Sequence, residues 1–352
     1  MIKYIGSKRR LVPVLADLCA AAGATRALDL FTGTTRVAQA FKRCGAHVTA
    51  VDTARYAEVF AQCYVELDGA AVDHREVERA LVDLESRSDV DGYVTETFCR
   101  RSRYFQPHNG RRIDAIRDAI ERDYRDSWLY PVLLTSLLEA ADRVDSTTGV
   151  QMAYVKQWAP RSFQPIALRV PELVAGPGAA VRGDACEVAS ALGHFDIAYL
   201  DPPYNQHRYF TNYHVWETIV AWDAPEYYGI ACKRVDARDE STKSVFNMRR
   251  SMPEALAQVV AAVDADLVVI SYNNESWVSI EELEAMAEAR GGAVRTLAFE
   301  SRRYVGAQIG IHNPSGEKVG RVSHVKNLEY VVCAGAPKMV EELWTSQAMS
   351  RS

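Results

Sequence analysis

The chain has 352 residues, of which 48% are hydrophobic and 25% charged, the ordinary balance of a soluble globular protein and not that of a disordered chain. Its net charge of -5 excludes a chain that is basic throughout, so any contact with nucleic acid has to be local. No window is apolar enough to cross a bilayer, and the charged N-terminus lacks the apolar core of a secretion signal. We therefore expect a cytoplasmic protein with no membrane partner.

Cysteine usage excludes two further classes. The seven cysteines are scattered without a Cys-x-x-Cys pair, and none lies beside a histidine at ligand spacing. The sequence therefore predicts neither a disulfide framework nor a metal site.

The first 52 residues have the pattern of a βαβ unit. The expected elements are a helix over residues 11–22, a strand over 27–31, a helix over 37–44 and a strand over 47–51. The turn Thr32-Gly-Thr-Thr35 joins the first strand to the second helix. Two strands joined through a helix indicate a parallel pair in an α/β sheet.

The sequence changes character near residue 70. Long helical patterns replace strands, over residues 72–85, 111–122 and 128–141. Strand patterns return over residues 179–182, 195–200, 265–271, 293–299 and 328–333. We therefore predict a catalytic α/β domain formed by residues 1–69 and 179–340, interrupted by a mainly helical insertion over 70–178, with residues 341–352 as a tail.

Polar residues gather after the predicted strands, where ligands bind in parallel α/β sheets. Gly33 lets a ligand approach the backbone, and Asp52, about 20 residues further on, can hold the hydroxyls of a ribose. The alternative interpretation of Asp52 and Asp184 is a helix cap or a turn acid. The three-glycine dinucleotide pattern is absent, because Thr35 and Arg36 stand after Gly33, which disfavours a nicotinamide enzyme.

The strongest signal is Asp201-Pro-Pro-Tyr204, at the end of the strand predicted over residues 195–200. The prolines Pro202 and Pro203 end the strand and fix their carbonyl groups as acceptors. A carboxylate and a rigid carbonyl can accept both hydrogens of one planar amino group, while Tyr204 offers a face for a heteroaromatic ring. Such a site keeps the nitrogen lone pair available and stabilises the cation that forms as it attacks an electrophile.

These segments resemble the Dam-like, alpha-group N6-adenine-specific DNA methyltransferases of bacteria and phages. The match is carried by Lys3-Tyr-Ile-Gly-Ser-Lys8, by Asp29-Leu-Phe-Thr-Gly33 with Asp52, by Gly183-Asp184 and by Asp201-Pro-Pro-Tyr204, in that order. Thr35 is a departure, since many members have a second glycine there. The resemblance covers about two-thirds of the chain and leaves the insertion unaligned.

The resemblance implies a Rossmann-like methyltransferase sheet that uses S-adenosylmethionine as cofactor. The implied cofactor-binding residues are Tyr4, Lys8, Asp29, Phe31, Gly33, Asp52, Asp184 and Asp201. Asp201 and the Pro202 carbonyl would hold the target N6 amine, with Tyr204 stacked on the adenine. The partner would be double-stranded DNA, bound by a monomer, and a cognate restriction endonuclease is a further expected partner.

A base inside a duplex cannot reach such a pocket, so the adenine must be flipped out of the helix. Tyr209 and Tyr213 are candidates for its opposite face; the alternative is that Tyr213 is a core residue of the next helix. The insertion supplies a basic segment, whose candidate DNA-binding residues are Arg100, Arg101, Arg103, Asn109, Arg111 and Arg112. Gln106 and His108 are further candidates for reading base edges, and the other interpretation of the segment is a solvated charged face.

Three expectations stay open beside the leading one. The same amine chemistry serves N4 of cytosine in DNA and N6 of adenine in RNA, although aspartate at the first motif position favours adenine. A catalytically idle DNA-binding module is the alternative from another class.

Residues 301–320, rich in glycine, arginine and tyrosine, are expected to form a hairpin over the mouth of the pocket.

Overall fold

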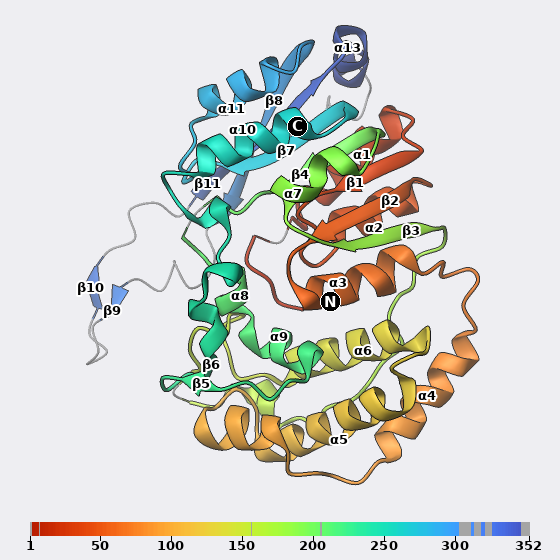
Figure 1. Ribbon diagram of the computed structural model, residues 1–352, viewed down its shortest axis with the longest axis vertical. Coiled ribbons are helices and arrows are strands. Elements are labelled where there is room, and N and C mark those ends of the chain that lie inside the picture. The colour runs from red at the N-terminus through yellow and green to blue at the C-terminus, as the bar shows by residue number, and fades with distance from the viewer. Residues whose placement is uncertain are drawn as a thin grey trace.

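The computed structural model describes residues 2–6, 8–155, 157–204, 206–302, 311–312, 318–320 and 326–345. Its central element is a seven-stranded sheet with the order β3-β2-β1-β4-β7-β11-β8 (Figure 1). Its strands are β1 Arg26–Asp29, β2 His47–Asp52, β3 Gly178–Arg182, β4 Phe195–Leu200, β7 Ala265–Asn273, β8 Ala293–Arg302 and β11 Lys326–Gly335. The pairs from β3 to β7 are parallel, and β11 is antiparallel to both of its neighbours. The predicted sheet, built from both ends of the chain, is confirmed.

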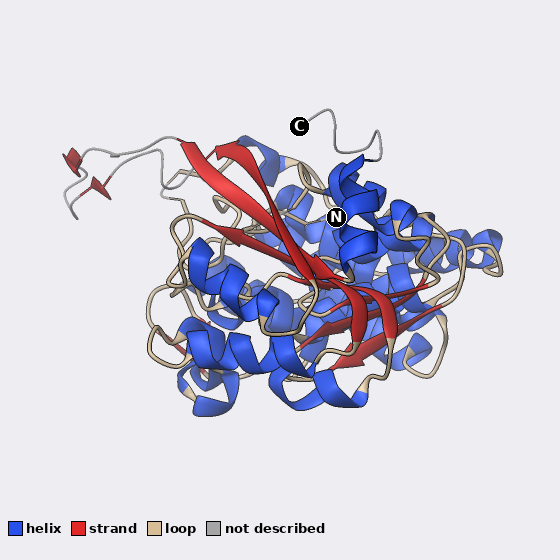
Figure 2. Ribbon diagram, turned by 90° about the horizontal axis from the view of Figure 1, so that it is seen from above, coloured by secondary structure: helices blue, strands red, loops and turns tan. Residues whose placement is uncertain are grey.

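Side chains of the central strands alternate between two apolar layers. In β4, Ile197 and Tyr199 pack on one side of the sheet, whereas Ala198 and Leu200 pack on the other. Figure 2 shows helices on both faces of the strands. One face is covered by α1 Val12–Ala21, α2 Arg36–Arg43, α3 Arg55–Ala61 and α13 Pro337–Thr345, and the other by α7 Ala185–Val188, α10 Met252–Ala262 and α11 Ile280–Glu288. Both faces are buried, which explains why these strands are almost continuously apolar.

A helical layer lies beyond α3, in the lower half of Figure 1. The insertion supplies α4 His74–Ser86, the π-helix η2 Val94–Arg101, α5 Pro107–Tyr124, α6 Leu129–Val144 and the 3-10 turn η3 Pro160–Phe163. Among the described residues from 70 to 177, none is in a strand. Residues after β4 join the same layer: α8 Tyr209–Asn212, α9 His214–Ala221 and the small hairpin of β5 Tyr227–Tyr228 and β6 Lys233–Arg234. The division into a catalytic and a recognition domain stays a prediction.

Short elements complete the fold. They are the π-helix η1 Gln62–Glu66, the 3-10 helices η4 Ala189–Ala191, η5 Val235–Arg238, η6 Glu240–Thr242 and η7 Val245–Asn247, and the strands β9 Ile311–His312 and β10 Lys318–Gly320. β9 and β10 pair antiparallel. The rest of the hairpin expected over residues 301–320 lies outside the described residues, so its place over the pocket stays a prediction.

The expected tail is wrong at its start. Residues 341–345 continue α13, and Leu343 of this helix is buried in the same apolar layer as α1. Residues 346–352 lie outside the described part of the chain. Within that part, no helix combines the length and the apolar character needed to span a bilayer.

Arg117 ties the insertion to α9. Its side chain is fully buried in α5, and it donates to the carbonyl oxygens of Ile219 (2.7 Å) and Val220 (3.0 Å) at the end of α9. Glu121 balances its charge at 2.9 Å, and its guanidinium lies 5.2 Å from the centre of the Trp222 ring. These contacts satisfy carbonyl groups that a helix end leaves without partners. They join α9, which follows strand β4 of the sheet, to α5 of the insertion.

We expect Arg117→Ala to lower the free energy of unfolding by about 2–4 kcal/mol, because it leaves two carbonyl groups at the end of α9 without their buried donor, whereas Glu121 keeps Arg125 and Tyr130 as partners. Urea unfolding followed by circular dichroism measures the loss. Arg122→Ala on the same helix is the control, since Arg122 is exposed and pairs only with its neighbour Asp123 among the contacts described. Equal stability of the two variants would contradict the role given to Arg117.

Candidate active site

The Asp-Pro-Pro-Tyr segment begins where β4, the central strand of the sheet, ends. β4 lies between β1 and β7, and Leu200 is its last residue. Asp201 and Pro203 line a cavity of about 340 Å³ beyond the carboxyl ends of the strands. The predicted position of the motif relative to the sheet is therefore confirmed, because a parallel sheet brings its carboxyl ends to one edge.

The ends of three further strands line the same cavity. β1 contributes Leu30 and Phe31, β2 contributes Asp52, and β3 leads into Gly183 and Asp184. The ring of Phe31 makes an edge contact with Phe246, with centroids 5.1 Å apart. The structure thus gathers four of the sequence motifs around one cavity whose walls carry both acids and aromatic rings.

Two of the acids also organise the backbone. Asp52 accepts hydrogen bonds from the amides of Gly33 (2.9 Å) and Ala54 (3.0 Å). Asp184 caps α7 by accepting from the amide of Cys186 (2.8 Å). Burial raises the pKa of Asp52, although these amides oppose the rise. Each acid therefore accepts hydrogen bonds from backbone amides, as the turn and cap interpretations predict, and also lines the cavity.

A recess of about 30 Å³ adjoins the cavity beside Gly33. Asp29 lines it and is buried, and one carboxylate oxygen accepts from Thr32 (2.9 Å) and from the amide of Ala38 (3.0 Å). Within the described residues the other oxygen, Oδ1, is buried without a hydrogen-bond partner. Burial raises the pKa of Asp29 to about 7. An orphaned acceptor of this kind fits a donor supplied by a ligand.

Lys8 forms a buried ion pair with Asp201. Its Nζ lies 3.1 Å from Asp201 Oδ1 and 4.0 Å from Glu329, and only 4% of its side chain is exposed. The ammonium also lies 5.7 Å from the centre of the Tyr204 ring. Burial raises the pKa of Asp201 to about 6, with Lys8 acting in the opposite direction. Burial likewise disfavours the charge of Lys8, but the combined attraction of Asp201, Tyr204 and Glu329 outweighs it and raises the pKa of Lys8.

The loop after β1 keeps its turn despite the departure at Thr35. Thr35 has a φ of 61°, in the left-handed region that favours glycine, and its hydroxyl accepts from the side chain of Gln39 (2.9 Å). Gly33 is more constrained, because a Cβ atom there would lie 3.0 Å from the ring of Tyr4. Thr35 therefore adopts the backbone conformation of the glycine that it replaces.

Tyr213 is not a face of the cavity. It is fully buried, its ring stacks on Tyr4 at 4.6 Å, and its hydroxyl accepts from the amide of Ile5 (2.6 Å). The expectation that it covers a flipped base is therefore wrong, and the alternative of a core residue holds. Tyr209 lines the cavity beside Tyr4, with ring centroids 5.3 Å apart.

The basic segment of the insertion is partly structural. Asn109 is fully buried and bonds to the backbone of Ser162, Gln164 and Ile166. Arg112 donates to the carbonyls of Arg87 and of Glu85 (2.8 Å), the latter in the last turn of α4. Asn109 is not available to DNA in this conformation, so that expectation is wrong, whereas the Arg112 side chain is partly exposed and its contact with DNA stays a prediction.

The other arginines of the segment reach the surface, although each has a partner. Arg100 pairs with Asp91 (2.7 Å), Arg101 with Glu96 (2.8 Å) and Arg111 with Asp89 (3.9 Å). Arg103 lies over the ring of Trp158, 4.7 Å from its centre. The acids come from just upstream of the segment, so the surface is less positive than the segment alone predicts. DNA contact by these four arginines stays a prediction.

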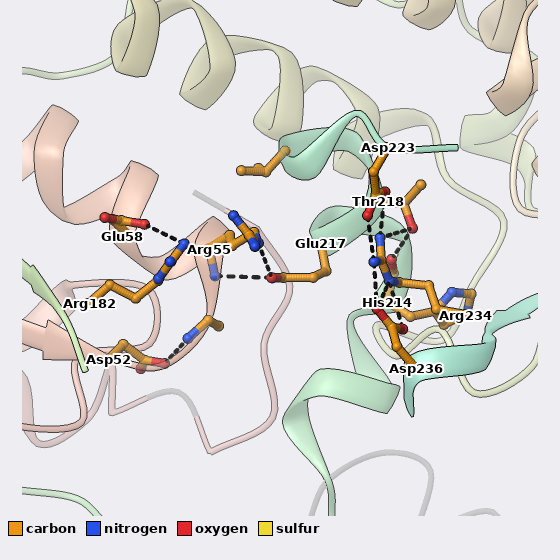
Figure 3. A network of polar contacts seen from close by, with 12 residues as sticks. Asp52, Arg55, Glu58, Arg182, His214, Glu217, Thr218, Asp223, Arg234 and Asp236 are labelled. Carbon is orange, nitrogen blue, oxygen red and sulfur yellow. Dashed lines mark hydrogen bonds and ion pairs between the residues drawn. The ribbon is translucent and has the colours of Figure 1, made fainter. Parts of the chain in front are cut away.

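Sequence reasoning missed one side of the cavity. Glu217 and Arg55 line it from α9 and α3, and they are joined by an ion pair of 3.6 Å (Figure 3). A strap formed by residues 241–247 closes another side, and Asn247 anchors it by donating to the carbonyl of His207 (3.1 Å). The strap lies within the segment from Lys233 to Arg250, whose six cations and three acids indicate only a charged patch.

One group with metal-ligand spacing, formed by His194, Asp196 and Asp266, is present among the described residues. It lies at the amino ends of β4 and β7, the sheet edge opposite the cavity. His194 already contacts Asp264 (3.0 Å) and Asp266 (3.4 Å) through its two ring nitrogens. The hydrogen bond with Asp264 and the neighbouring Asp266 raise the pKa of His194, and the protonated imidazole donates to both carboxylates, which leaves no ring nitrogen for an ion.

The strand order, with a single reversed strand next to the edge, is that of the Rossmann-like methyltransferase fold, and the cavity lies where such enzymes act. A family model described as D12 class N6 adenine-specific DNA methyltransferase matches residues 4–286, so the chain belongs to that family. Its activity is accordingly the site-specific methylation of adenine in DNA. Methyltransferases of this family generally use S-adenosylmethionine.

Similar proteins are methylases of restriction-modification systems. The chain is 30% identical over 319 residues to the type II methyltransferase M.NlaIII of Neisseria lactamica, covering 86% of this chain and 92% of the relative. It is 26% identical over 312 residues to M.FokI of Planomicrobium okeanokoites, covering 82% of this chain and 47% of that protein. M.CviAII of Paramecium bursaria Chlorella virus 1 is 33% identical over 221 residues, covering 60% of this chain and 64% of the viral protein.

Proposed function

We propose that the chain binds S-adenosylmethionine in the cavity and transfers its methyl group to N6 of an adenine turned out of duplex DNA. The residues present fit this cofactor. Asp52 and Asp184 offer acceptors for a ribose and an adenine, and Phe31 offers an apolar ring beside them. The orphaned Oδ1 of Asp29 suits the ammonium group of the cofactor's methionine part.

The observation that carries the proposal is the position of Asp201 at both the cavity and its recess. When bound, the cofactor supplies an electrophilic methyl group. Asp201 and the Pro202 carbonyl would accept the two N–H hydrogens of the target amine and keep its lone pair out of the ring. The carboxylate then stabilises the positive charge that develops on the nitrogen.

The flipped base would stack on Tyr204. This side chain is held by an edge contact with Tyr272, with centroids 5.7 Å apart, and by the Lys8 ammonium on its face. A rigid ring of this kind positions a heteroaromatic base at little cost in entropy. Tyr209 remains the candidate for the opposite face, because it lines the cavity. Extraction of the base costs a few kcal/mol of lost stacking and pairing, which contacts with the DNA backbone must offset.

We expect the double variant Arg100→Ala, Arg101→Ala to weaken DNA binding and to lower the dependence of log Kd on log salt by about 2, one unit for each lost phosphate contact. Both arginines are exposed, and their acid partners are exposed as well. Fluorescence anisotropy of a labelled duplex at several salt concentrations measures the slope. The control is the double variant Arg122→Ala, Arg125→Ala, at the C-terminal end of α5. Identical slopes in all proteins would contradict a DNA contact at this surface.

The relatives indicate a wider setting. Because they are modification methylases, we propose that a cognate restriction endonuclease recognises the same DNA sequence. We further propose that the chain acts as a monomer on DNA in the cytoplasm. Mapping methylated adenines in a host that expresses the chain gives the recognition sequence, and sedimentation of the DNA complex gives the stoichiometry.

The test of the function uses the purified protein, labelled S-adenosylmethionine and DNA from an unmethylated host. Mass analysis of the nucleosides should find N6-methyladenine in the DNA. N4-methylcytosine, or label only in RNA, would replace this function by one of its alternatives. Cofactor binding without any transfer would favour an idle DNA-binding module.

A further inference from the structure

Glu217 is an acid of the cavity wall that the proposed function has not used. It lies on α9, its side chain is 4% exposed, and it faces the cavity from outside the sheet. Its carboxylate accepts from the amide of Arg55, with one oxygen at 3.1 Å and the other at 3.3 Å. The guanidinium of Arg55, half exposed at the cavity wall, is its ion-pair partner.

Glu217 and Asp52 meet at the same helix end. Asp52 accepts from the amide of Ala54, and Glu217 accepts from the next amide, that of Arg55. Ala54 has no side chain that could cap α3, so the carboxylate of Asp52, two residues before it, and the distant carboxylate of Glu217 do so instead. The consecutive amides bring an acid from β2 and an acid from α9 together on one cavity (Figure 3).

Capping alone does not account for a carboxylate at this position, and because Arg55 is half exposed, its ion pair offsets little of the cost of burying the charge. An amide N–H needs only an acceptor, which a glutamine would provide without the cost of burying a charge. That cost is present here, because burial raises the pKa of Glu217 to about 7. A carboxylate oxygen accepts more than one hydrogen bond, so donors from the cavity can still reach it.

We propose that Glu217 joins Asp52 in holding the ribose of the cofactor, each carboxylate accepting from one of the two vicinal hydroxyl groups. The inference rests on the proposed use of S-adenosylmethionine and extends its site to a residue outside the methyltransferase motifs. It also makes α9, which Arg117 ties to the insertion, part of the cofactor site. Glu217 thereby becomes a specificity-determining residue for ribose against sugars without the diol.

Calorimetry with two ligands tests the proposal. The ligands are S-adenosylhomocysteine and its 2′,3′-dideoxy counterpart, and the proteins are the wild type and Glu217→Gln, which keeps an acceptor for the Arg55 amide. We expect the substitution to weaken the binding of S-adenosylhomocysteine by about 10-fold, because the hydroxyl group no longer donates to a charged acceptor. The dideoxy ligand should bind both proteins within about twofold, since it has no hydroxyl to donate.

Asp114→Asn is the matched control. Asp114 is a buried acid that accepts from the amides of Gly92 (3.0 Å), Val94 (2.9 Å) and Thr95 (2.8 Å) and lies outside the cavity. Its loss should lower the melting temperature and leave both affinities unchanged. If Glu217→Gln lowers the affinity for both ligands equally, or lowers neither affinity, the proposed role of Glu217 is overturned while the proposed function still stands. A wild type that binds no S-adenosylhomocysteine would overturn the proposed function, and this inference with it.

Discussion

Asp201→Asn is expected to lower the single-turnover rate of methyl transfer by about 10³-fold, the scale on which enzymes lose activity with one preorganised electrostatic contact. The amide has nearly the shape of the carboxylate, but it carries no charge and has one acceptor oxygen in place of two. It can therefore neither hold the amine in the same way nor stabilise the cation that forms. Cofactor binding should largely persist, because Asp52, Asp184 and Phe31 are untouched.

Rapid-quench assays with labelled cofactor measure this rate, and calorimetry with S-adenosylhomocysteine measures binding. Asp196→Asn is the control, since it makes the same change on the same strand at the edge opposite the cavity. A rate within tenfold of the wild type in Asp201→Asn would remove Asp201 from the mechanism.

Lys8→Met is expected to move the acidic limb of the pH–rate profile upward by at least about one unit. Asp201 stabilises the positive charge that develops on the amine only when it is ionised, so the rate falls as the pH drops through its pKa. That pKa is about 6 with Lys8 in place, and Lys8 is the group that holds it down against burial. Without the ammonium the carboxyl group stays protonated to higher pH, and the rate at neutral pH falls with it.

Single-turnover rates between about pH 5 and about pH 9, the range in which such groups titrate, define the limb for each protein. Lys3→Met is the control, because Lys3 pairs with Asp142 (3.0 Å) and Asp145 (3.2 Å), neither of which lines the cavity. Superimposable profiles of Lys8→Met and the wild type would show that the ion pair does not set the charge of Asp201.

Local pattern was enough to predict the sheet. The strand over residues 195–200 was predicted with the bounds of β4, and the other parallel strands differ by one or two residues. These strands are runs of apolar residues that end near glycine, proline or an acidic residue. The apolar run and the residues that end it therefore predict the same strand bounds. Because these strands are parallel, the prediction also placed Asp52, Asp184 and Asp201 at one edge of the sheet. Asp29 follows the same logic, although its unpaired oxygen could be found only from its surroundings.

Side chains whose roles depend on distant partners could not be predicted. Asn109 has the chemistry of a base-reading residue, yet loop residues more than 50 positions away take its hydrogen bonds. Tyr213 follows the motif as a flanking aromatic should, but the N-terminal segment packs over it. Glu217 carries no motif at all. For the basic segment, Asp89, Asp91 and Glu96 were close enough in sequence to be counted, which would have reduced its expected charge.

The shared position of α9 limits how the insertion can be exchanged between relatives. Arg117 bonds to the end of this helix, and Trp222, just beyond it, donates to Asp118 of α5 (2.9 Å). A chimaera that transplants only residues 70–178 would therefore set a foreign α5 against the resident α9 and break both contacts. The transferable unit consists of two separate pieces of chain, residues 70–178 and residues 209–238, and a graft should carry both.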